Sequence, residues 1–182
     1  LFRLARGTGL HGAGGIRPAR DFYVRPLLCL TRTEVEAYCR AAGQEWVTDE
    51  TNLSDAYARN RLRHDALPAL RQANAGAERN LARFCEKAAR ADAYFARAAG
   101  ALLTGAAEGP GVWALEPLQK ADPLVLEAAA HALVAPHRDP EERYIRLVCR
   151  MVRQGSGAVQ LRPDVRLRAG QGCLWLETPP PE

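Results

Sequence analysis

The sequence lacks the features that mark membrane and secreted proteins. No apolar run in its 182 residues approaches the ~18 that a membrane-spanning helix needs. The first fifteen residues do not follow the plan of a secretory signal peptide, because Arg3 and Arg6 interrupt the apolar positions. We therefore expect a cytoplasmic protein with no membrane partner. We also expect Leu1, which stands where a start methionine would, to be a cut or processed end.

Paired cysteines are missing too. The chain has five cysteines, an odd number, with no Cys-x-x-Cys pair and no Cys/His cluster at zinc spacing. Such scattered cysteines are typical of reduced thiols in a cytosolic protein. We expect no metal site among them.

Lysine is nearly absent, since 23 arginines stand beside only two lysines in a chain of formal net charge +4. Residues 138–168 hold eight arginines against four acids, and residues 1–71 hold eleven against eight. Arginine binds phosphate with two hydrogen bonds and stacks on bases, so this bias is compatible with a nucleic-acid partner. A GC-rich genome would produce the same bias, and the composition alone does not choose between the two causes.

The pattern of apolar residues and breakers predicts a mainly α protein with a small β element. Thr31 with Glu34 forms a capping-box signature for a helix that Gly43 ends. The glycine-rich stretch 7–15 lacks a phosphate-loop pattern, so we expect a mobile connector there. The other expected elements are an edge strand in 20–28, a helix from Ala56, a second helix capped by Asp65, a long helix over 75–103, Asp-Pro-started helices near 122–134 and 139–154, and two or three closing strands in 157–177.

The densest polar cluster lies between Asp49 and His64. Arg59 and Arg63 are i, i+4 neighbours on the predicted helix, where like charges cost about 0.2–0.5 kcal/mol. A solvated face with salt bridges would explain an ordinary charge run. Asn60 and His64 stand beside the two arginines, however, so this side is rich in donors and poor in acceptors. A phosphate-bearing ligand would offset the repulsion. No nucleophile–base pair emerges elsewhere, and His64 is the one histidine inside a polar cluster.

Three stretches carry a resemblance to a known family. They are "LFRLARGTG" (1–9), "RPLLCLTRTEVEAYCRAAGQEWVTDETN" (25–52) and "DAYARNRLRHDALPAL" (55–70). In order and spacing they resemble tRNA(Ile)-lysidine synthetases, which belong to the PP-loop ATP pyrophosphatases. The resemblance is specific in residues 25–70 and loose from residue 110 onward.

The resemblance implies a function, partners and site residues. The family adenylates the wobble cytidine of tRNA(Ile) with ATP and Mg²⁺, and the lysine ε-amino group then displaces AMP to form lysidine. The resemblance implies a Rossmann-like remnant over residues 1–72, followed by a helical tRNA-binding domain over residues 73–182 that a β-hairpin closes. A homodimer is also compatible with this resemblance. Arg59 and Arg63 would be catalytic residues. The residues expected to bind phosphate or tRNA are Arg6, Asn52, Asn60, Arg61 and His64.

The chain departs from the family in what it lacks. The ATP-binding "SGGxDS" loop and the acidic "DDQxET" segment are absent, and "LRPDVRLR" stands where glycines are usual. We therefore expect the C-terminal part of such an enzyme, inactive alone and with no cofactor bound. A non-enzymatic nucleic-acid-binding helical module stays open as an alternative. A related tRNA thiolase is disfavoured, because sulfur transfer needs paired thiolates.

Overall fold

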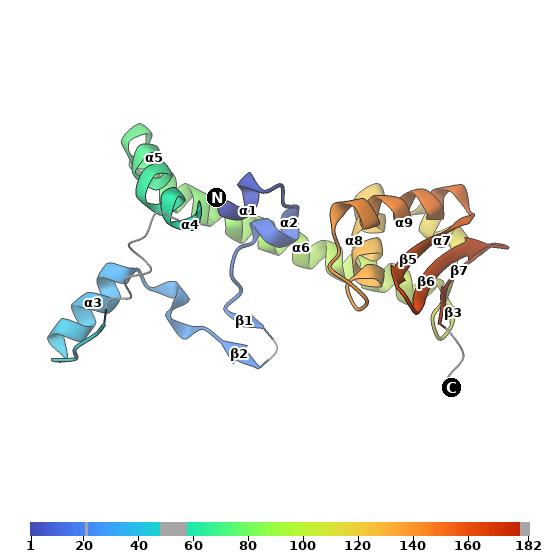
Figure 1. Ribbon diagram of the computed structural model, residues 1–182, viewed down its shortest axis with the longest axis horizontal. Helices are drawn as coiled ribbons and strands as arrows, with labels where there is room; N and C mark the ends of the chain where they lie inside the picture. The colour runs from blue at the N-terminus through green and yellow to red at the C-terminus, as the bar shows by residue number, and fades with distance from the viewer. Residues whose placement is uncertain (21, 48–57, 179–182) are drawn as a thin grey trace. The chain divides into compact units, whose positions relative to one another are not determined.

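A computed structural model describes residues 1–20, 22–47 and 58–178 (Figure 1). The chain divides into two compact units, Leu1–Asp92 and Ala93–Glu182. The described part is mainly helical with a small antiparallel sheet, in agreement with the predicted fold class. No helix in the described ranges combines the length and the apolar character needed to cross a bilayer.

The first unit is built from short elements and the first half of one long helix. In chain order these are α1 (Phe2–Ala5), α2 (Leu10–Ala13), β1 (Ala19–Arg20), β2 (Tyr23–Val24), a 3₁₀ turn (Pro26–Cys29), α3 (Arg32–Ala41), α4 (Ala58–Arg61), a π-helical turn (Leu62–Ala66), α5 (Leu67–Ala73) and α6 (Ala77–Ala106). The predicted edge strand is thus a two-residue strand, β2, paired with β1.

Helix α3 begins as its sequence predicts. The Thr31 hydroxyl accepts a hydrogen bond from the Glu34 backbone N–H, and the Glu34 carboxylate accepts one from the Thr31 N–H at 2.7 Å. These hydrogen bonds hold the pKa of Glu34 below its usual value. Gly43 follows the helix with a φ of +65°, the left-handed conformation expected at this position.

The glycine-rich stretch is not a bare connector. It contains α2 and lies against α6, where a Cβ added at Gly14 would stand 3.1 Å from the Ala89 Cβ. Arg17 Nη2 and His11 Nδ1 both contact Asp92 Oδ2, at 2.8 and 3.1 Å. The expectation of a mobile connector missed these contacts because their partners lie about 75 residues further along the chain.

Helices α4 and α5 are joined by the π-helical turn. The backbone stays in the right-handed helical region at Arg61, Ala66 and Leu67, so the chain does not break where a cap by Asp65 was predicted. Pro68 has no N–H and would clash with the carbonyl four residues earlier in an α-helix. The wider π turn just before it makes room for the proline ring, and this explains why no cap is needed.

The second unit packs helices on one face of a sheet. Its elements are the second half of α6, β3 (Ala107–Gly109), β4 (Val112–Ala114), α7 (Leu115–Lys120), α8 (Pro123–Val134), α9 (Glu142–Gln154), β5 (Gly157–Arg162), β6 (Val165–Gly170) and β7 (Cys173–Glu177). The strand order is β3-β4-β7-β6-β5, and every pair is antiparallel. The largest fully buried side chains include Leu118, Leu126, Val148, Leu167 and Leu174.

Two details of this unit differ from the sequence prediction. The closing strands belong to a five-stranded sheet, because β4 adds to β7 through pairs such as Val112 with Trp175. Asp122 caps α8 by accepting from the Leu124 N–H, as predicted. The residue at the corresponding position of α9 is Glu141, which makes no capping hydrogen bond, so this helix does not start at Asp139–Pro140.

Candidate anion-binding site

Two distant segments of the first unit meet at the ring of Phe2. The Arg6 guanidinium carbon lies 5.5 Å from the ring centroid, and that of Arg59 lies 5.2 Å from it. Cations at such distances are attracted by the ring's quadrupole. The fold therefore brings together two predicted site residues that are 53 positions apart in the sequence.

A cavity of about 330 Å³ opens beside this ring. Its walls come from α1, from the π-helical turn and its flanks, and from the start of α6. Arg59 and Arg63 are its cationic residues, and Glu78 is its acid. The apolar lining consists of Leu1, Phe2, Leu4, Leu62, Leu67, Leu81, Ala82, Phe84 and Cys85.

The charges around the cavity are unbalanced. Arg71 Nη2 donates to Glu78 Oε1 at 2.7 Å, so the acid is already paired. Within the described ranges, no ion pair joins Arg59 or Arg63 to a carboxylate. Two exposed cations beside a largely apolar wall form a place where an anion would be attracted. The arrangement is thus suited to a phosphate group that carries an apolar or aromatic neighbour, as a nucleotide does.

The other predicted site residues are placed differently. Asn60 is buried, with 8% of its surface exposed, so its side chain faces the protein interior. Arg61 and His64 are exposed and do not line the cavity. Asn52 lies outside the described residues. The roles predicted for these residues stay predictions.

Sequence reasoning missed the apolar half of the site. Phe2 was not among the predicted site residues, yet it is the ring against which two arginines lie. Leu62 and Leu67 line the cavity from the flanks of the π-helical turn, and Phe84 lines it from α6. No local pattern reveals such a convergence, because each residue looks like an ordinary core position of its own helix.

The described residues do not form a metal-binding cluster. Across residues 1–20, 22–47 and 58–178, no group of three or more His, Cys, Asp or Glu side chains could hold a metal ion. The residues of these ranges therefore do not fit an all-protein Mg²⁺ site.

Comparisons with known proteins identify the segment that carries Phe2, Arg59 and Arg63. Residues 1–70 match the model of the PP-loop domain. The chain is 43% identical over 95 residues to a tRNA(Ile)-lysidine synthase of Parabacteroides distasonis. The aligned region covers 52% of the chain and 22% of that protein. It is 47% identical over 81 residues to the enzyme of that name from Bacteroides thetaiotaomicron, covering 44% of the chain and 19% of the relative.

A third relative is the tRNA(Ile)-lysidine synthase of Geobacter sulfurreducens, which is 43% identical over 99 residues, covering 53% of the chain and 21% of that protein. The matched part of the chain thus spans about a fifth of the length of each of these relatives. Residues 1–70 of the chain therefore match the PP-loop domain, and about half of the chain is similar to proteins named tRNA(Ile)-lysidine synthase.

Proposed function

We propose that this chain is part of a tRNA-modifying ligase that forms lysidine. In the proposed reaction the wobble cytidine of tRNA(Ile) is adenylated by ATP with release of pyrophosphate, and the ε-amino group of lysine then displaces AMP. The observation that carries the proposal is that Arg59 and Arg63 line one cavity beside the Phe2 ring, against which Arg6 also lies. These four residues belong to the segment that matches the PP-loop domain.

Arg59 and Arg63 have defined tasks in this proposal. Negative charge accumulates on the reacting phosphate and the leaving pyrophosphate during adenylation. Fixed guanidinium groups in a partly apolar site stabilise such charge better than water does. Arg6, Asn52, Asn60, Arg61 and His64 are proposed to bind ATP phosphate or the tRNA backbone. Because the described residues do not fit a Mg²⁺ site, we assign them no metal-dependent step.

The exposed apolar surface of the first unit supports a larger α/β domain around it. Large apolar side chains between residues 16 and 47 lie open to solvent, among them Phe22 at 85% and Val47 at 94% exposure. Apolar side chains that stay in water contribute none of the stabilisation that their burial would give, and a large exposed group of them commonly marks a contact surface. They are the side chains expected where this segment packs within a nucleotide-binding domain. A homodimer would be an alternative cover and stays a prediction.

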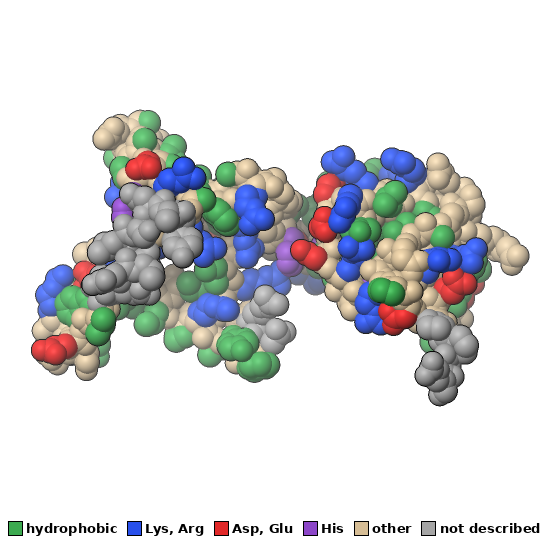
Figure 2. Space-filling view, viewed as in Figure 1, with side chains coloured by type: hydrophobic (Ala, Val, Ile, Leu, Met, Phe, Trp, Pro, Cys, Tyr) green, Lys and Arg blue, Asp and Glu red, His purple; other side chains and the backbone are tan. Residues whose placement is uncertain are grey.

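A second candidate function is a nucleic-acid-binding module without catalysis. It is favoured by arginines on the outer side of α9, which lie along one stripe of the helix: Arg143, Arg146, Arg150 and Arg153. Figure 2 shows basic side chains gathered over this helix. Such a module would bind tRNA without modifying it.

Labelled-lysine incorporation tests the proposed function. The chain is joined behind a PP-loop core that carries the Ser-Gly-Gly-x-Asp-Ser loop, and the product is incubated with tRNA(Ile), ATP and labelled lysine. We expect lysine to enter the tRNA and Arg63→Ala to reduce this by at least tenfold. Arg83→Ala removes an exposed arginine of α6 outside the cavity and is the matched control. Equal activity of both variants would remove Arg63 from the site, and tRNA binding without incorporation would favour the second candidate.

A further inference from the structure

The outer face of the sheet in the second unit carries an unusual set of side chains. Strand residues alternate between a buried face and an outer face, and the outer residues of β6 are Arg166 and Arg168. In the registers of the sheet, Gln160, Arg166 and Glu177 stand side by side in one row. The adjacent row places Trp175 directly opposite Arg168. Two arginines and a tryptophan thus share one solvent-facing patch, which we call the sheet platform.

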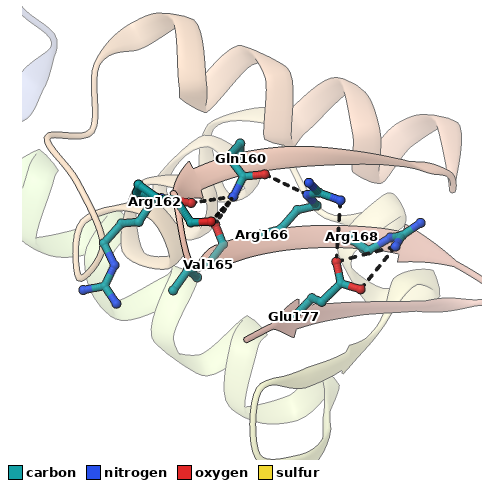
Figure 3. Close-up of polar contacts among 7 residues, drawn as sticks. Gln160, Arg162, Val165, Arg166, Arg168 and Glu177 are labelled. Carbon is teal, nitrogen blue, oxygen red and sulfur yellow. Dashed lines mark hydrogen bonds and ion pairs between the residues drawn. The ribbon is translucent and has the colours of Figure 1, made fainter. Parts of the chain in front are cut away.

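The two arginines of the sheet platform are held in fixed positions (Figure 3). Arg166 Nε donates to Gln160 Oε1 at 2.8 Å, and Arg166 Nη1 lies 3.9 Å from Glu177 Oε2. Arg168 Nη1 lies 3.2 Å from Glu177 Oε1. One carboxylate therefore neutralises only one of two cations, and both guanidinium groups keep donors for a further anion.

Gln160 positions this pair. Its amide nitrogen donates to backbone oxygens in the β5–β6 turn, including Val165 O at 3.3 Å, while its oxygen receives the Arg166 Nε–H. The side chain thus links the turn to the guanidinium. A cation that is already immobilised loses less conformational entropy when it binds a ligand.

The indole of Trp175 differs from the ring of Tyr144 in the same unit, because it is available for stacking. The Tyr144 ring is covered by two guanidinium groups, those of Arg138 at 3.4 Å and Arg143 at 4.8 Å from its centroid. Within the described part of the chain, no such cation–π contact covers Trp175. Its ring lies against the backbone of Gly170, whose added Cβ would be 3.6 Å from the indole. The platform therefore offers a partly exposed aromatic surface beside two cations.

We propose that the sheet platform binds a single-stranded RNA segment, with one base stacked on Trp175 and a neighbouring phosphate held by Arg166 and Arg168. Every base has a π face, so stacking on an aromatic side chain tolerates any sequence. The inference rests on the proposed function for its RNA partner and adds a contact surface to it. A duplex hides its base faces and would not use Trp175 in this way.

The platform is a separate surface from the arginine stripe of α9. Helix α9 packs on the buried face of the sheet with Val148 and Val152, while Arg146 and its neighbours point away from the sheet. The basic segment 138–168 is therefore divided between two opposite sides of the unit. A matched control lies outside both arginine surfaces, because Lys120 of α7 is paired with Glu116 as Arg168 is paired with Glu177.

The test measures binding of the whole chain to an unstructured eight-nucleotide RNA by fluorescence anisotropy in ~0.1 M salt. Trp175→Leu should weaken binding roughly 5- to 150-fold, the range expected for loss of one stacked base, while Trp175→Phe should keep most of it. Arg166→Gln and Arg168→Gln should each weaken binding about fivefold and reduce the salt slope by about 0.7, as expected for one lost phosphate contact. Lys120→Gln should bind as the unchanged chain does.

The outcomes separate the inference from the proposed function. Equal losses for Lys120→Gln and Arg168→Gln, or unchanged binding by Trp175→Leu, would overturn the sheet platform while binding of tRNA(Ile) still supported the function. Equal affinity for a blunt RNA duplex would also overturn it. A chain that binds neither the octamer nor tRNA(Ile) would overturn the platform and the RNA-binding part of the function together. If Trp175→Leu fails to fold, as judged by circular dichroism, the comparison of Arg166→Gln and Arg168→Gln with Lys120→Gln decides alone.

Discussion

Arg59 and Arg63 stand four residues apart on one helix, and both line the same cavity. Their repulsion is a small local cost, about 0.2–0.5 kcal/mol in a helix. The fold offsets part of it for Arg59 by placing the Phe2 ring beneath the guanidinium. Arg63 has no such contact among the described residues. At the scale of single residues, therefore, Arg63 depends more strongly than Arg59 on a ligand for its place in the cavity.

The first prediction compares these two arginines. Arg63→Ala should leave the free energy of unfolding within about 0.5 kcal/mol of the unchanged chain, because it breaks no contact within the described ranges. Arg59→Ala should cost about 0.5–1 kcal/mol through loss of the cation–π contact. Thermal unfolding followed by circular dichroism measures both. A loss near 3 kcal/mol for Arg63→Ala would point to a buried ion pair and exclude an anion-binding role for it.

The second prediction concerns two cysteines. Burial, aided by the nearby carboxylate of Glu127, raises the pKa of Cys149 to about 11. At pH 8 only about a thousandth of this thiol would be the reactive thiolate. Cys29 is exposed. We expect iodoacetamide at pH 8 to modify Cys29 well before Cys149, as peptide mass spectrometry would show. Equal rates of modification would mean that the core around α9 opens readily.

At the scale of elements, local signals succeeded where the interaction itself is local. The capping box at Thr31 and the cap at Asp122 each lie within three residues of their partners, and both were predicted from sequence. Strand β4 was missed because its pairing partner, β7, lies about 60 residues further along the chain. The cavity was missed for the same reason, since Phe2 and Arg59 meet only after folding.

The third prediction tests the end of α9. Gly155 has a φ of +71°, and a Cβ there would lie 3.2 Å from Gln119 Nε2, whose nitrogen donates to Val152 O. Gly155→Ala should destabilise the second unit by about 1–2 kcal/mol, because L-residues resist this conformation. Gly100→Ala is the matched control: nothing lies within 4 Å of its added Cβ, and mid-helix alanine should stabilise by about 0.5–1 kcal/mol. Chemical denaturation measures both. Stabilisation by Gly155→Ala would contradict the left-handed conformation there.

At the scale of the whole molecule, basic surfaces occur in both units. The cavity of the first unit and the two arginine surfaces of the second each present guanidinium groups that a negatively charged partner would bind. Sequence reasoning identified the basic segment 138–168, but it could not reveal that helix and strand turn its arginines to opposite sides. That outcome depends on which residues pack on the core.

The fourth prediction is that the chain binds tRNA with a strong dependence on salt. Each neutralised phosphate releases counterions, so log affinity should fall linearly as log salt rises, by about 0.7–0.9 per contact. Filter binding between 50 and 200 mM salt measures the slope. An affinity that stays constant over this range would contradict binding through either arginine surface.

The fifth prediction is that the chain alone does not catalyse ATP–pyrophosphate exchange. Its sequence has no Ser-Gly-Gly-x-Asp-Ser loop, and its described residues offer no cluster for a metal ion. Exchange of labelled pyrophosphate into ATP measures this directly, with a full-length relative as the positive control. Saturable exchange by the purified chain would contradict the proposal that adenylation needs further residues.

The π-helical turn Leu62–Ala66 has a consequence for changes in chain length. A π turn holds one residue more than the α-helical turn it replaces. Loss of one residue within the turn would therefore leave the two flanking helices facing as they do now, and the remaining apolar wall of the cavity would keep its orientation. The same loss within α5 would turn the residues that follow by about 100° around the helix axis. The cost of a deletion in the turn would fall on Pro68, whose ring would then clash with the carbonyl four residues earlier.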